Sequence, residues 1–277
     1  MGNLKDDTLT KKMNNKTFLL CLGTQKAGTS WLWDFLKDQK NINFGYRKEY
    51  HVFDRLQFQK FMQKDVKDLK YVAESGNITA HKDLFKRLSM ISNTNEYFDY
   101  FSNLLHSGAA DITGDFTPLY SLLDTQTLNF IKDEFHKRGI ETKVIFLMRD
   151  PVERIWSATR MSMRELKLKN IPLVGAHKEK FVEMLTRYEV IVPKINSVFN
   201  QDSVYYNFYE KLFTDGTMKE ILEFLNLPMA QANFSKRVNQ SKYAKIAQRD
   251  REIVEQYYAD TYSFVKDEFK ENYAWRY

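Results

Sequence analysis

The amino-acid sequence predicts an α/β fold in which a central parallel β-sheet is flanked by helices. Three observations support this prediction. Short apolar runs alternate with amphipathic segments along the chain, as expected when each buried strand is followed by a helix that packs on the sheet. The 277 residues, 43% of them hydrophobic, suffice for a large core. A glycine-containing turn joins the first apolar run to the first amphipathic segment, where such folds bind ligands.

Five short apolar runs are expected to form the strands. The run "TKVIFLM" is the strongest, because it is continuous and β-branched like strands that are buried on both faces. Amphipathic spacing, or a proline near the first turn, indicates the helices. The expected strands are residues 17–23, 41–45, 111–116, 142–148 and 203–208. The expected helical segments are residues 29–40, 124–139, 181–199 and 219–227, one that begins near residue 151, and a single long terminal helix over 249–269.

Neither a repeat nor a linker divides the chain, so we expect a single domain over residues 1–277, with 1–16 as a flexible N-terminal segment. That segment contains no apolar stretch, so we expect neither a signal peptide nor a membrane anchor, and a soluble, cytoplasmic protein. The single cysteine, Cys21, lies inside an apolar run. It excludes an internal disulfide and a cysteine zinc cluster, and it is expected in the core.

The charge balance is mildly basic. Forty-two Lys and Arg residues stand against 36 Asp and Glu, for a formal net charge of +6. This balance mildly favours anionic ligands, although taken alone it is better explained by a mixed, solvated surface. The basic residues do not cluster with aromatic residues in any nucleic-acid readout motif, so no nucleic-acid partner is expected.

The stretch "LGTQKAGTSWL" follows the first predicted strand and is similar to a phosphate-binding loop. Gly23 and Gly28 have the Walker A spacing, but Thr29 stands where that motif has lysine, and the lysine is Lys26. Glycines allow a tight turn whose N–H groups point at an anion beside a helix N-terminus, and Lys26 adds a full charge. The alternative is an ordinary strand-to-helix turn with a solvated lysine.

The stretch "FLMRDPVERIWSATR" is a second candidate anion site. Arg149 follows a predicted strand directly, and Ser157 lies two helical turns further along the next helix. An arginine and a serine so placed can grip a second phosphate. Arg154 could do the same, or could pair with Glu153 or Asp150. Asp150 before a proline is also a good helix N-cap.

Together, "GTQKAGTSWL" and "RDPVERIWS" resemble the sulfotransferase family that uses 3′-phosphoadenosine 5′-phosphosulfate (PAPS), a family with a P-loop-like nucleotide-binding fold. The resemblance implies that the first loop and the start of its helix hold the 5′-phosphosulfate, and that Arg149 and Ser157 hold the 3′-phosphate. The residues implied for the first group are Gln25, Lys26, Ala27, Gly28, Thr29, Ser30 and Trp31.

Further segments are similar to the heparan sulfate and Golgi-type branch of that family. "KEYHVFD" (48–54) resembles the segment whose glutamate is the catalytic base, and "GDFTPLY" (114–120) a substrate-side segment. "NFYEKLF" resembles a strand end of that branch, and "FSKRVNQSK" its late variable loop near the nucleotide. That branch has a membrane anchor and often a disulfide. Neither is present in this sequence, which looks more like a soluble bacterial or viral relative.

The resemblance implies in-line transfer of a sulfuryl group from PAPS to an acceptor, leaving 3′-phosphoadenosine 5′-phosphate (PAP). Glu49 is the candidate general base. His51 is a rival base on the same face of an extended strand, with orientation of Glu49 as its alternative role. Lys26 would stabilise the leaving oxygen, and Lys48 would bind the sulfonate or an acidic acceptor. No metal is expected.

The acceptor is expected to be a hydroxyl of a carbohydrate or small metabolite. Four aromatic residues could stack on it, namely Tyr46, Tyr50, Tyr120 and Trp156, although most aromatic residues belong to the core. A basic stripe of Arg160, Arg164 and Lys167 could attract an anionic glycan, or could simply be a solvated helix face. Two alternatives stay open: a P-loop kinase-like phosphotransferase, and a non-catalytic protein that binds PAPS or a sulfated glycan. The oligomeric state is not predicted.

Overall fold

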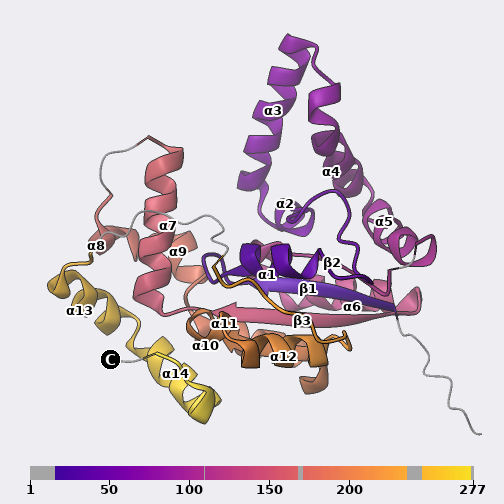
Figure 1. Ribbon diagram of the computed structural model, residues 1–277. Helices are drawn as coiled ribbons and strands as arrows, with labels where there is room; N and C mark the ends of the chain where they lie inside the picture. The colour runs from indigo at the N-terminus through magenta and orange to yellow at the C-terminus, as the bar shows by residue number, and fades with distance from the viewer. Residues whose placement is uncertain (1–15, 109, 168–170, 236–244, 276–277) are drawn as a thin grey trace, which may run out of the picture.

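The protein has an α/β fold built on one four-stranded parallel sheet (Figure 1). The computed structural model describes residues 16–108, 110–167, 171–235 and 245–275. The strands are β1 (Lys16–Gly23), β2 (Ile112–Asp115), β3 (Ile140–Met148) and β4 (Val204–Phe208). Their spatial order is β2-β1-β3-β4, and all three pairings are parallel. The predicted fold class is therefore confirmed.

One predicted strand does not form. Residues 41–45 make a single bridge, between Ile42 and Ile112, beside the edge strand β2. The Asn43 side chain accepts the Gly45 N–H at 3.0 Å, and Gly45 has a φ of +75°. This turn bends the chain away from the sheet before a strand can continue, because a left-handed glycine and an Asx-type hydrogen bond favour a turn.

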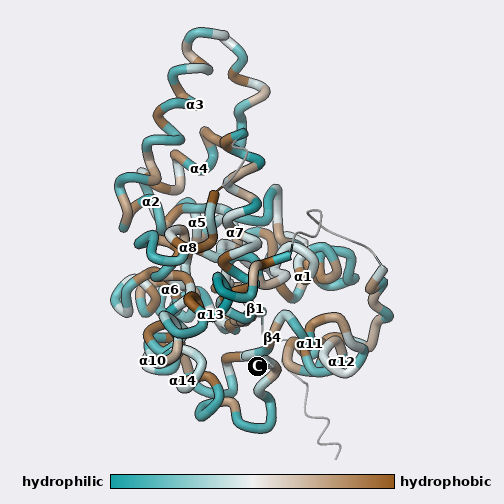
Figure 2. Tube along the Cα trace, turned by 90° about the vertical axis from the view of Figure 1, so that its left-hand side faces the viewer, coloured by the Kyte–Doolittle hydropathy of each residue, from teal (hydrophilic) through white to brown (hydrophobic). Residues whose placement is uncertain are grey.

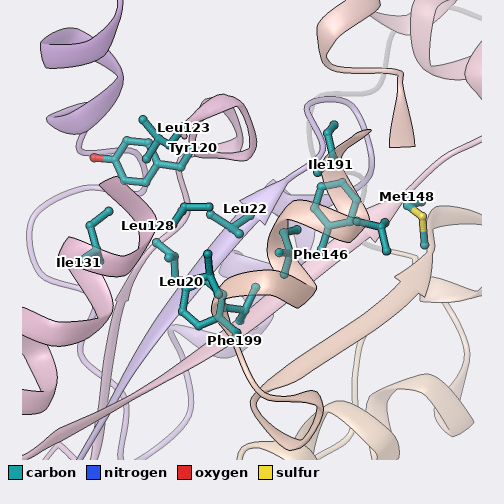
Figure 3. Close-up of a cluster of buried hydrophobic side chains, with 14 of the residues drawn as sticks. Leu20, Leu22, Tyr120, Leu123, Leu128, Ile131, Phe146, Met148, Ile191 and Phe199 are labelled. Atoms are coloured by element: carbon teal, nitrogen blue, oxygen red, sulfur yellow. The ribbon is translucent and has the colours of Figure 1, made fainter. Parts of the chain in front are cut away.

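Alternation along the strands divides the core into two layers. Leu20 and Leu22 of β1 face one side of the sheet, where they pack with Phe146 of β3 and with side chains of helices α6 and α10 (Figure 3). Leu19 and Cys21 face the opposite layer, beneath helices α1 and α12. Cys21 is fully buried, as predicted. The two layers follow from the period-2 geometry of a strand, which points successive side chains to opposite faces.

The helices occupy most of the predicted segments. The α-helices before β3 are α1 (Thr29–Leu36), α2 (Phe53–Gln57), α3 (Met62–Ser75), α4 (Lys82–Ser92), α5 (Thr94–His106) and α6 (Thr125–Lys137). Those after β3 are α7 (Pro151–Glu165), α8 (Leu173–Ala176), α9 (Lys180–Met184), α10 (Tyr188–Val198), α11 (Tyr209–Leu212), α12 (Asp215–Phe224), α13 (Gln248–Tyr257) and α14 (Ala259–Phe269). Short 3₁₀ turns are η1 (Gln59–Phe61), η2 (Thr79–His81), η3 (Pro118–Leu122), η4 (Gln201–Ser203) and η5 (Lys270–Asn272).

The predicted terminal helix is two helices rather than one. Tyr258 separates α13 from α14 with a backbone conformation of φ −103° and ψ 22°. Its side chain is fully buried, and its hydroxyl donates to the His177 carbonyl at 2.6 Å. The break lets both helices pack against the body at different angles, which one straight helix could not do.

Helices α3 and α4 form a hairpin that projects from the body, which we call the arm (residues 62–92). Figures 1 and 2 show this projection from two directions. The arm lies between the first strand and the second in the sequence and stands above the edge where β1 ends. In the described part of the chain, no helix combines the length and hydrophobicity required to cross a membrane.

Candidate active site

The loop between β1 and α1 has the geometry of an anion cradle. Lys26 and Gly28 both have a left-handed backbone, with φ of 73° and 87°. Gly28 occupies the N-cap of α1, and its carbonyl accepts the N–H groups of Trp31 and Leu32 at 3.0 and 3.1 Å. The helix therefore starts immediately after the turn, so that its positive end lies at the loop.

Arg149 joins this loop to the end of β3. Its Nη1 donates to the Lys26 carbonyl at 3.1 Å, and its guanidinium lies over the Tyr209 ring at 4.1 Å. Its Nε is buried without a hydrogen-bond partner among the described residues. The two stretches predicted as separate phosphate sites therefore meet at one position, and the guanidinium retains a buried donor for a further ligand.

Helix α7 presents Ser157 to the same space and is capped as predicted. The Asp150 side chain accepts the Glu153 N–H at 3.0 Å, and Pro151 occupies the first turn. Ser157 is buried and lies on the inner side of the helix. The Asp150 carboxylate also accepts the Tyr262 hydroxyl at 2.9 Å, so its role is structural.

Arg154 does not take the role considered for it. The side chain is fully buried and does not line the cleft. Its Nε donates to Thr186 Oγ1 at 3.0 Å, and its Nη2 donates to the Val182 carbonyl at 2.8 Å. Within the described part of the chain, Arg154 pairs with neither Asp150 nor Glu153. It instead connects α7 to α9 and to the turn that follows α9, and burial lowers its pKa.

A cleft of about 880 Å³ opens at this edge of the sheet. It brings together all but one of the predicted site residues: Gln25, Lys26, Gly28, Thr29, Ser30, Trp31, Lys48, Glu49, His51, Arg149 and Ser157. The exception is Ala27, whose side chain is buried in the core behind the loop, so that it could offer only backbone atoms. Trp31 is mostly buried between Phe213 and Phe234, at ring distances of 5.1 and 5.8 Å.

The segment after the predicted second strand carries a hydrogen-bonded charge cluster. Lys48 Nζ lies 2.6 Å from Glu49 Oε1 and 3.3 Å from Thr29 Oγ1. The His51 ring bridges two carboxylates, with Nε2 at 3.1 Å from Glu49 Oε2 and Nδ1 at 2.9 Å from Asp54 Oδ2. Glu49 and His51 thus meet directly, although the reason differs from the predicted one. His51 has a φ of 56°, so the segment is not an extended strand.

The charges in this cluster shift the pKa of both groups. Burial acts to raise the pKa of Glu49, but hydrogen bonds and charge from His51 and Lys48 outweigh it and lower the pKa to about 2. Burial acts to lower the pKa of His51, but the hydrogen bonds from Asp54 and Glu49 outweigh it and raise the pKa. Glu49 is therefore ionised at neutral pH, and His51 favours the imidazolium that donates to both carboxylates.

Side chains of the "GDFTPLY" stretch (114–120) hold the backbone of residues 48–54 in place. The Tyr50 N–H donates to Thr117 Oγ1 at 3.0 Å and to Asp115 Oδ1 at 3.3 Å. The Val52 N–H donates to the Tyr120 hydroxyl at 2.9 Å. Burial raises the pKa of Asp115 to about 6, against the hydrogen bonds that favour its charged form. Pro118 and Leu119 line the cleft, while the polar groups of this stretch orient backbone.

Lys26, Arg149 and Arg164 bring three positive charges into the lining of the cleft. Burial lowers the pKa of Lys26, and the positive charges of Arg164 and Arg149 lower it further. Among the described residues, the hydrogen-bond partner of Lys26 Nζ is the thioether of Met161, at 3.6 Å. A half-buried ammonium beside two guanidinium groups is electrostatically costly unless an anion binds between them. The arrangement therefore fits a polyanionic ligand.

The aromatic residues expected to stack on an acceptor are placed differently. Tyr50 and Tyr120 are fully buried in the core, so this part of the prediction is wrong. Neither Tyr46 nor Trp156 lines the cleft. Of the basic stripe, Arg160 and Arg164 line it and Lys167 does not. The aromatic lining consists instead of Trp31, Phe61, Tyr209 and Phe213.

Several cleft residues gave no signal in the sequence. Arg55, Lys60, Phe61 and Lys64 come from α2 to α3, which no motif singled out. Asp54 stood inside a quoted motif without a role of its own. The late loop resemblance at 234–242 falls mostly on residues 236–244, outside the described ranges. Within the described ranges, no group of three or more His, Cys, Asp or Glu side chains is placed to hold a metal ion.

Comparison with known proteins identifies the class of protein. A model of the sulfotransferase domain matches residues 16–271, so the chain belongs to the sulfotransferase domain family and is a sulfotransferase enzyme. Enzymes of this family generally use PAPS. A sulfotransferase from Alicyclobacillus acidocaldarius has a similar structure, with a TM-score of 0.65 and 15% identity over 91% of this chain and 94% of that chain.

The sulfotransferase domain of the Synechococcus PCC 7002 olefin synthase is also similar, with a TM-score of 0.50 and 16% identity over 87% of this chain and 94% of that chain. No curated protein sequence matches this chain. At these identities the structural likeness supports the fold, and the site must be interpreted from its own residues.

Proposed function

We propose that this enzyme transfers the sulfuryl group of PAPS to an acceptor hydroxyl, with Glu49 as general base. The observation that carries the proposal is the contact between the two anion sites, in which Arg149 Nη1 donates to the Lys26 carbonyl. One polyanionic donor can therefore touch both. Arg149 Nε is a buried donor without a partner in the described chain, and the positive charges of Lys26, Arg149 and Arg164 repel one another. Both features fit a ligand with two phosphate-like groups.

The donor side divides into two parts. The loop N–H groups, Lys26 and the hydroxyls of Thr29 and Ser30 would hold the 5′-phosphosulfate at the start of α1. Arg149 and Ser157 would hold the 3′-phosphate. When bound, PAPS supplies an activated sulfuryl group on a phosphate leaving group. Lys26 and Lys48 would stabilise negative charge on the transferred group and the leaving oxygen.

Glu49 would accept the acceptor proton. In the overall reaction a bond forms between the acceptor oxygen and sulfur, the bond from sulfur to the phosphate oxygen breaks, and the phosphate keeps the electron pair. Glu49 is ionised at neutral pH, and its Oε2 is oriented by the His51 ring at 3.1 Å. Lys48 reaches both Glu49 Oε1 and Thr29 Oγ1, so it spans the distance between the base and the donor loop.

The acceptor side favours a negatively charged molecule, such as an acidic carbohydrate. A second cavity of about 300 Å³ shares five lining residues with the main cleft, namely Lys48, Glu49, His51, Arg55 and Lys64. Arg47 and Arg87 complete its lining. Arg160 and Arg164 face the main cleft. A cleft with this excess of cations concentrates anions and speeds their association.

The family match and the site both disfavour the kinase-like alternative. The end of β3 presents Arg149 where a kinase would place a metal-binding carboxylate, and Asp150 is engaged as a helix cap and with Tyr262. A non-catalytic binding protein would have no need of a base, and Glu49 lies in the cleft with a defined orientation.

Calorimetric titration with PAP and with adenosine 5′-phosphate tests the donor site. We expect PAP to bind at least tenfold more tightly, and Arg149→Ala to weaken PAP about 100-fold while changing adenosine 5′-phosphate little, because charged hydrogen bonds contribute about 1.5–3 kcal/mol. Arg138→Ala is the matched control, since Arg138 pairs with Glu134 and Asp99 on the surface. Equal binding of both nucleotides, indifferent to Arg149, would contradict the two-site donor.

Transfer of ³⁵S from labelled PAPS tests the reaction and the acceptor class. Matched neutral and carboxylated oligosaccharides should differ at least tenfold in kcat/KM, and the preference should weaken with added salt. Lys64→Ala should raise KM for the acidic acceptor and leave PAP affinity intact. A preference for neutral acceptors would remove the proposal of an acidic substrate while leaving the sulfuryl transfer standing.

A further inference from the structure

A chain of charged side chains runs from the arm to the candidate base. Asp65 of α3 accepts Arg55 Nε at 3.0 Å, and Arg55 Nη1 donates to Asp54 Oδ2 at 2.7 Å. The same Asp54 oxygen lies 2.9 Å from His51 Nδ1. The opposite ring nitrogen of His51 meets the Glu49 carboxylate at 3.1 Å. Five side chains from the arm to the cleft are therefore linked without a gap.

The inner members of this chain are almost removed from water. Asp54 and Asp65 are fully buried, and Arg55 is 7% exposed. Burying a charge is unfavourable unless it is paired, and well-packed apolar side chains would often stabilise the same volume better. Stability alone therefore does not explain why charged side chains attach the arm to the body. Charged pairs do, however, fix the orientation and the charge state of the groups that they contact.

Arg55 couples the position of Asp65 to the position of Asp54, because its guanidinium is planar and rigid. One edge binds Asp65, and another atom of the same plane binds Asp54. Fixing Asp65 on α3 therefore fixes the plane, and the plane fixes the Asp54 oxygen that receives the His51 ring. Arg87 of α4 also donates to Asp65, through the carboxylate oxygen that Arg55 does not use.

We propose that Asp65 is a positioning residue for the reaction, which acts through Arg55 and Asp54 to set the orientation and charge of the His51–Glu49 pair. This inference rests on the proposed function for the role of Glu49, whereas the coupling of the arm to His51 does not depend on it. The arm thereby becomes part of the catalytic apparatus without touching the reacting atoms.

The charges around His51 determine whether its pKa should rise or fall in Asp65→Asn. Its own segment contributes Lys48, Glu49 and Asp54. The elements packed around it contribute Arg55, Asp115, Lys64 and Arg87, and Arg47 lines the adjoining cavity. In Asp65→Asn a buried anion is lost, and Arg55 loses a partner and turns its full charge toward Asp54. Both changes disfavour the imidazolium, so the His51 pKa should fall, by roughly one unit.

NMR titration of the imidazole ring measures this shift without any need for activity. The chain has 5 histidines, and the His51 signal is assigned by its absence in His51→Gln. Arg87→Gln is the discriminating variant, because it removes a cation and leaves Asp65 bound to Arg55. It should raise the His51 pKa or leave it in place. A general loosening of the arm would move the pKa in the same direction in both variants and would overturn the proposal.

Kinetics supply the second readout. Asp65→Asn should lower kcat about 10- to 100-fold, because small misplacements of a reacting group cost up to 100-fold, while PAP affinity stays within twofold of wild type. The alkaline limb of the pH–kcat profile, where His51 loses its proton, should move with the His51 titration. Asp65→Glu, which keeps the charge, should recover part of kcat. Glu74→Gln, an exposed site on the same helix, should match wild type.

The outcomes separate the two proposals. Inactivity of the wild-type protein toward every acceptor would count against the proposed function, and the His51 shift would still test the coupling. An unchanged His51 pKa in Asp65→Asn, or a fall in PAP affinity that accounts for the lost activity, would overturn the positioning role. Should Asp65→Asn fail to give a folded protein, the double variant Asp65→Asn/Arg87→Gln takes its place, since it leaves no unpaired arginine on α4.

Discussion

The proposed donor side and the proposed acceptor side of the cleft are held in place by different kinds of structure. On the donor side, the loop after β1 and the start of α7 are fixed by regular structure, because each follows a strand of the parallel sheet directly. On the acceptor side, residues 48–54 are not a regular strand, and side chains hold their backbone. The Tyr50 and Val52 N–H groups are satisfied by Thr117 and Tyr120 rather than by a neighbouring strand.

This difference teaches where each side is vulnerable. The position of a donor-side residue is set by the strand that precedes it, so a substitution there should change PAP binding without altering neighbouring residues. An acceptor-side residue depends on a network, in which His51 contacts both Glu49 and Asp54. Substitutions there should spread to the pKa values and geometry of neighbours, because low-dielectric polar networks are cooperative.

The largest effect expected is the loss of the base. Glu49→Gln removes the proton acceptor and leaves a side chain of nearly the same shape, so kcat should fall about 10²–10⁴-fold. PAP affinity should stay close to wild type, since Lys26 and Arg149 are untouched. Single-turnover transfer of ³⁵S together with PAP calorimetry measures both. A variant that keeps a tenth or more of wild-type kcat would show that Glu49 is not the base and that His51 deserves the same test.

The glycines of the two regions provide the next contrast. Gly28 of the donor loop and Gly76 at the tip of the arm both have a positive φ, of 87° and 68°. An alanine at either site costs about 1–2 kcal/mol from the left-handed backbone. At Gly28 the new Cβ would also lie 2.5 Å from Leu212 Cδ2, inside a packed core, whereas nothing lies within 4 Å at Gly76. Overpacking adds about 1–3 kcal/mol at Gly28 alone.

Chemical denaturation of both variants measures this difference. Gly28→Ala should lose more stability than Gly76→Ala and should also weaken PAP, because the displaced atoms include Tyr209, which supports Arg149. Equal losses in the two variants, with PAP binding intact, would mean that the donor loop is less rigid than its packing indicates.

The sequence predicted the donor side well for a physical reason. A strand, a glycine turn and a helix are local in sequence, so their spacing determines the position of the anion cradle. The same holds for the Asp150 cap, whose partner is the Glu153 N–H three residues further along the chain. The errors on this side were residues whose surroundings are set by distant segments. Arg154 was one, because Thr186 and Val182, which bind it, lie about thirty positions away.

The acceptor side was predictable in its residues and not in its geometry. The motif placed Lys48, Glu49 and His51 together, yet nothing in the sequence indicated the left-handed backbone of His51, since most non-glycine residues, histidine included, have a negative φ. The arm network was invisible because Arg55, Asp65 and Arg87 meet across three helices. A solvated charge in a helix and a buried paired one look alike in sequence, and tertiary packing alone separates them.

A smaller effect is expected at Ser157. Ser157 is buried and lines the same cleft as Arg149, where its hydroxyl would be a neutral donor to the 3′-phosphate. Ser157→Ala should weaken PAP about tenfold, since a hydrogen bond to a charged group contributes about 1.5–3 kcal/mol, and should leave adenosine 5′-phosphate unchanged. Calorimetry again decides. A parallel loss for both nucleotides would place Ser157 against the adenosine rather than the 3′-phosphate.

The smallest expected effect is the pH dependence of stability through Glu49 and His51. The Glu49 pKa is about 2 in the folded chain and 4.5 ordinarily, so its stabilising contribution is complete above pH 4.5 and is lost as pH falls toward 2. The raised pKa of His51 acts in the opposite sense. Its contribution is complete below pH 6.5 and is lost as pH rises through the folded pKa.

The stability difference between wild type and Glu49→Gln should therefore be largest between about pH 4.5 and 6.5 and should shrink on both sides of that window. It should be modest, because 35% of the Glu49 side chain is exposed to solvent that screens the pair. Denaturant unfolding of both proteins across this range measures it. A difference that stays constant as pH rises well above 6.5 would mean that Lys48, and not His51, is the main partner of Glu49. The acceptor side would then depend on a single ion pair rather than on the network that distinguishes it from the donor side.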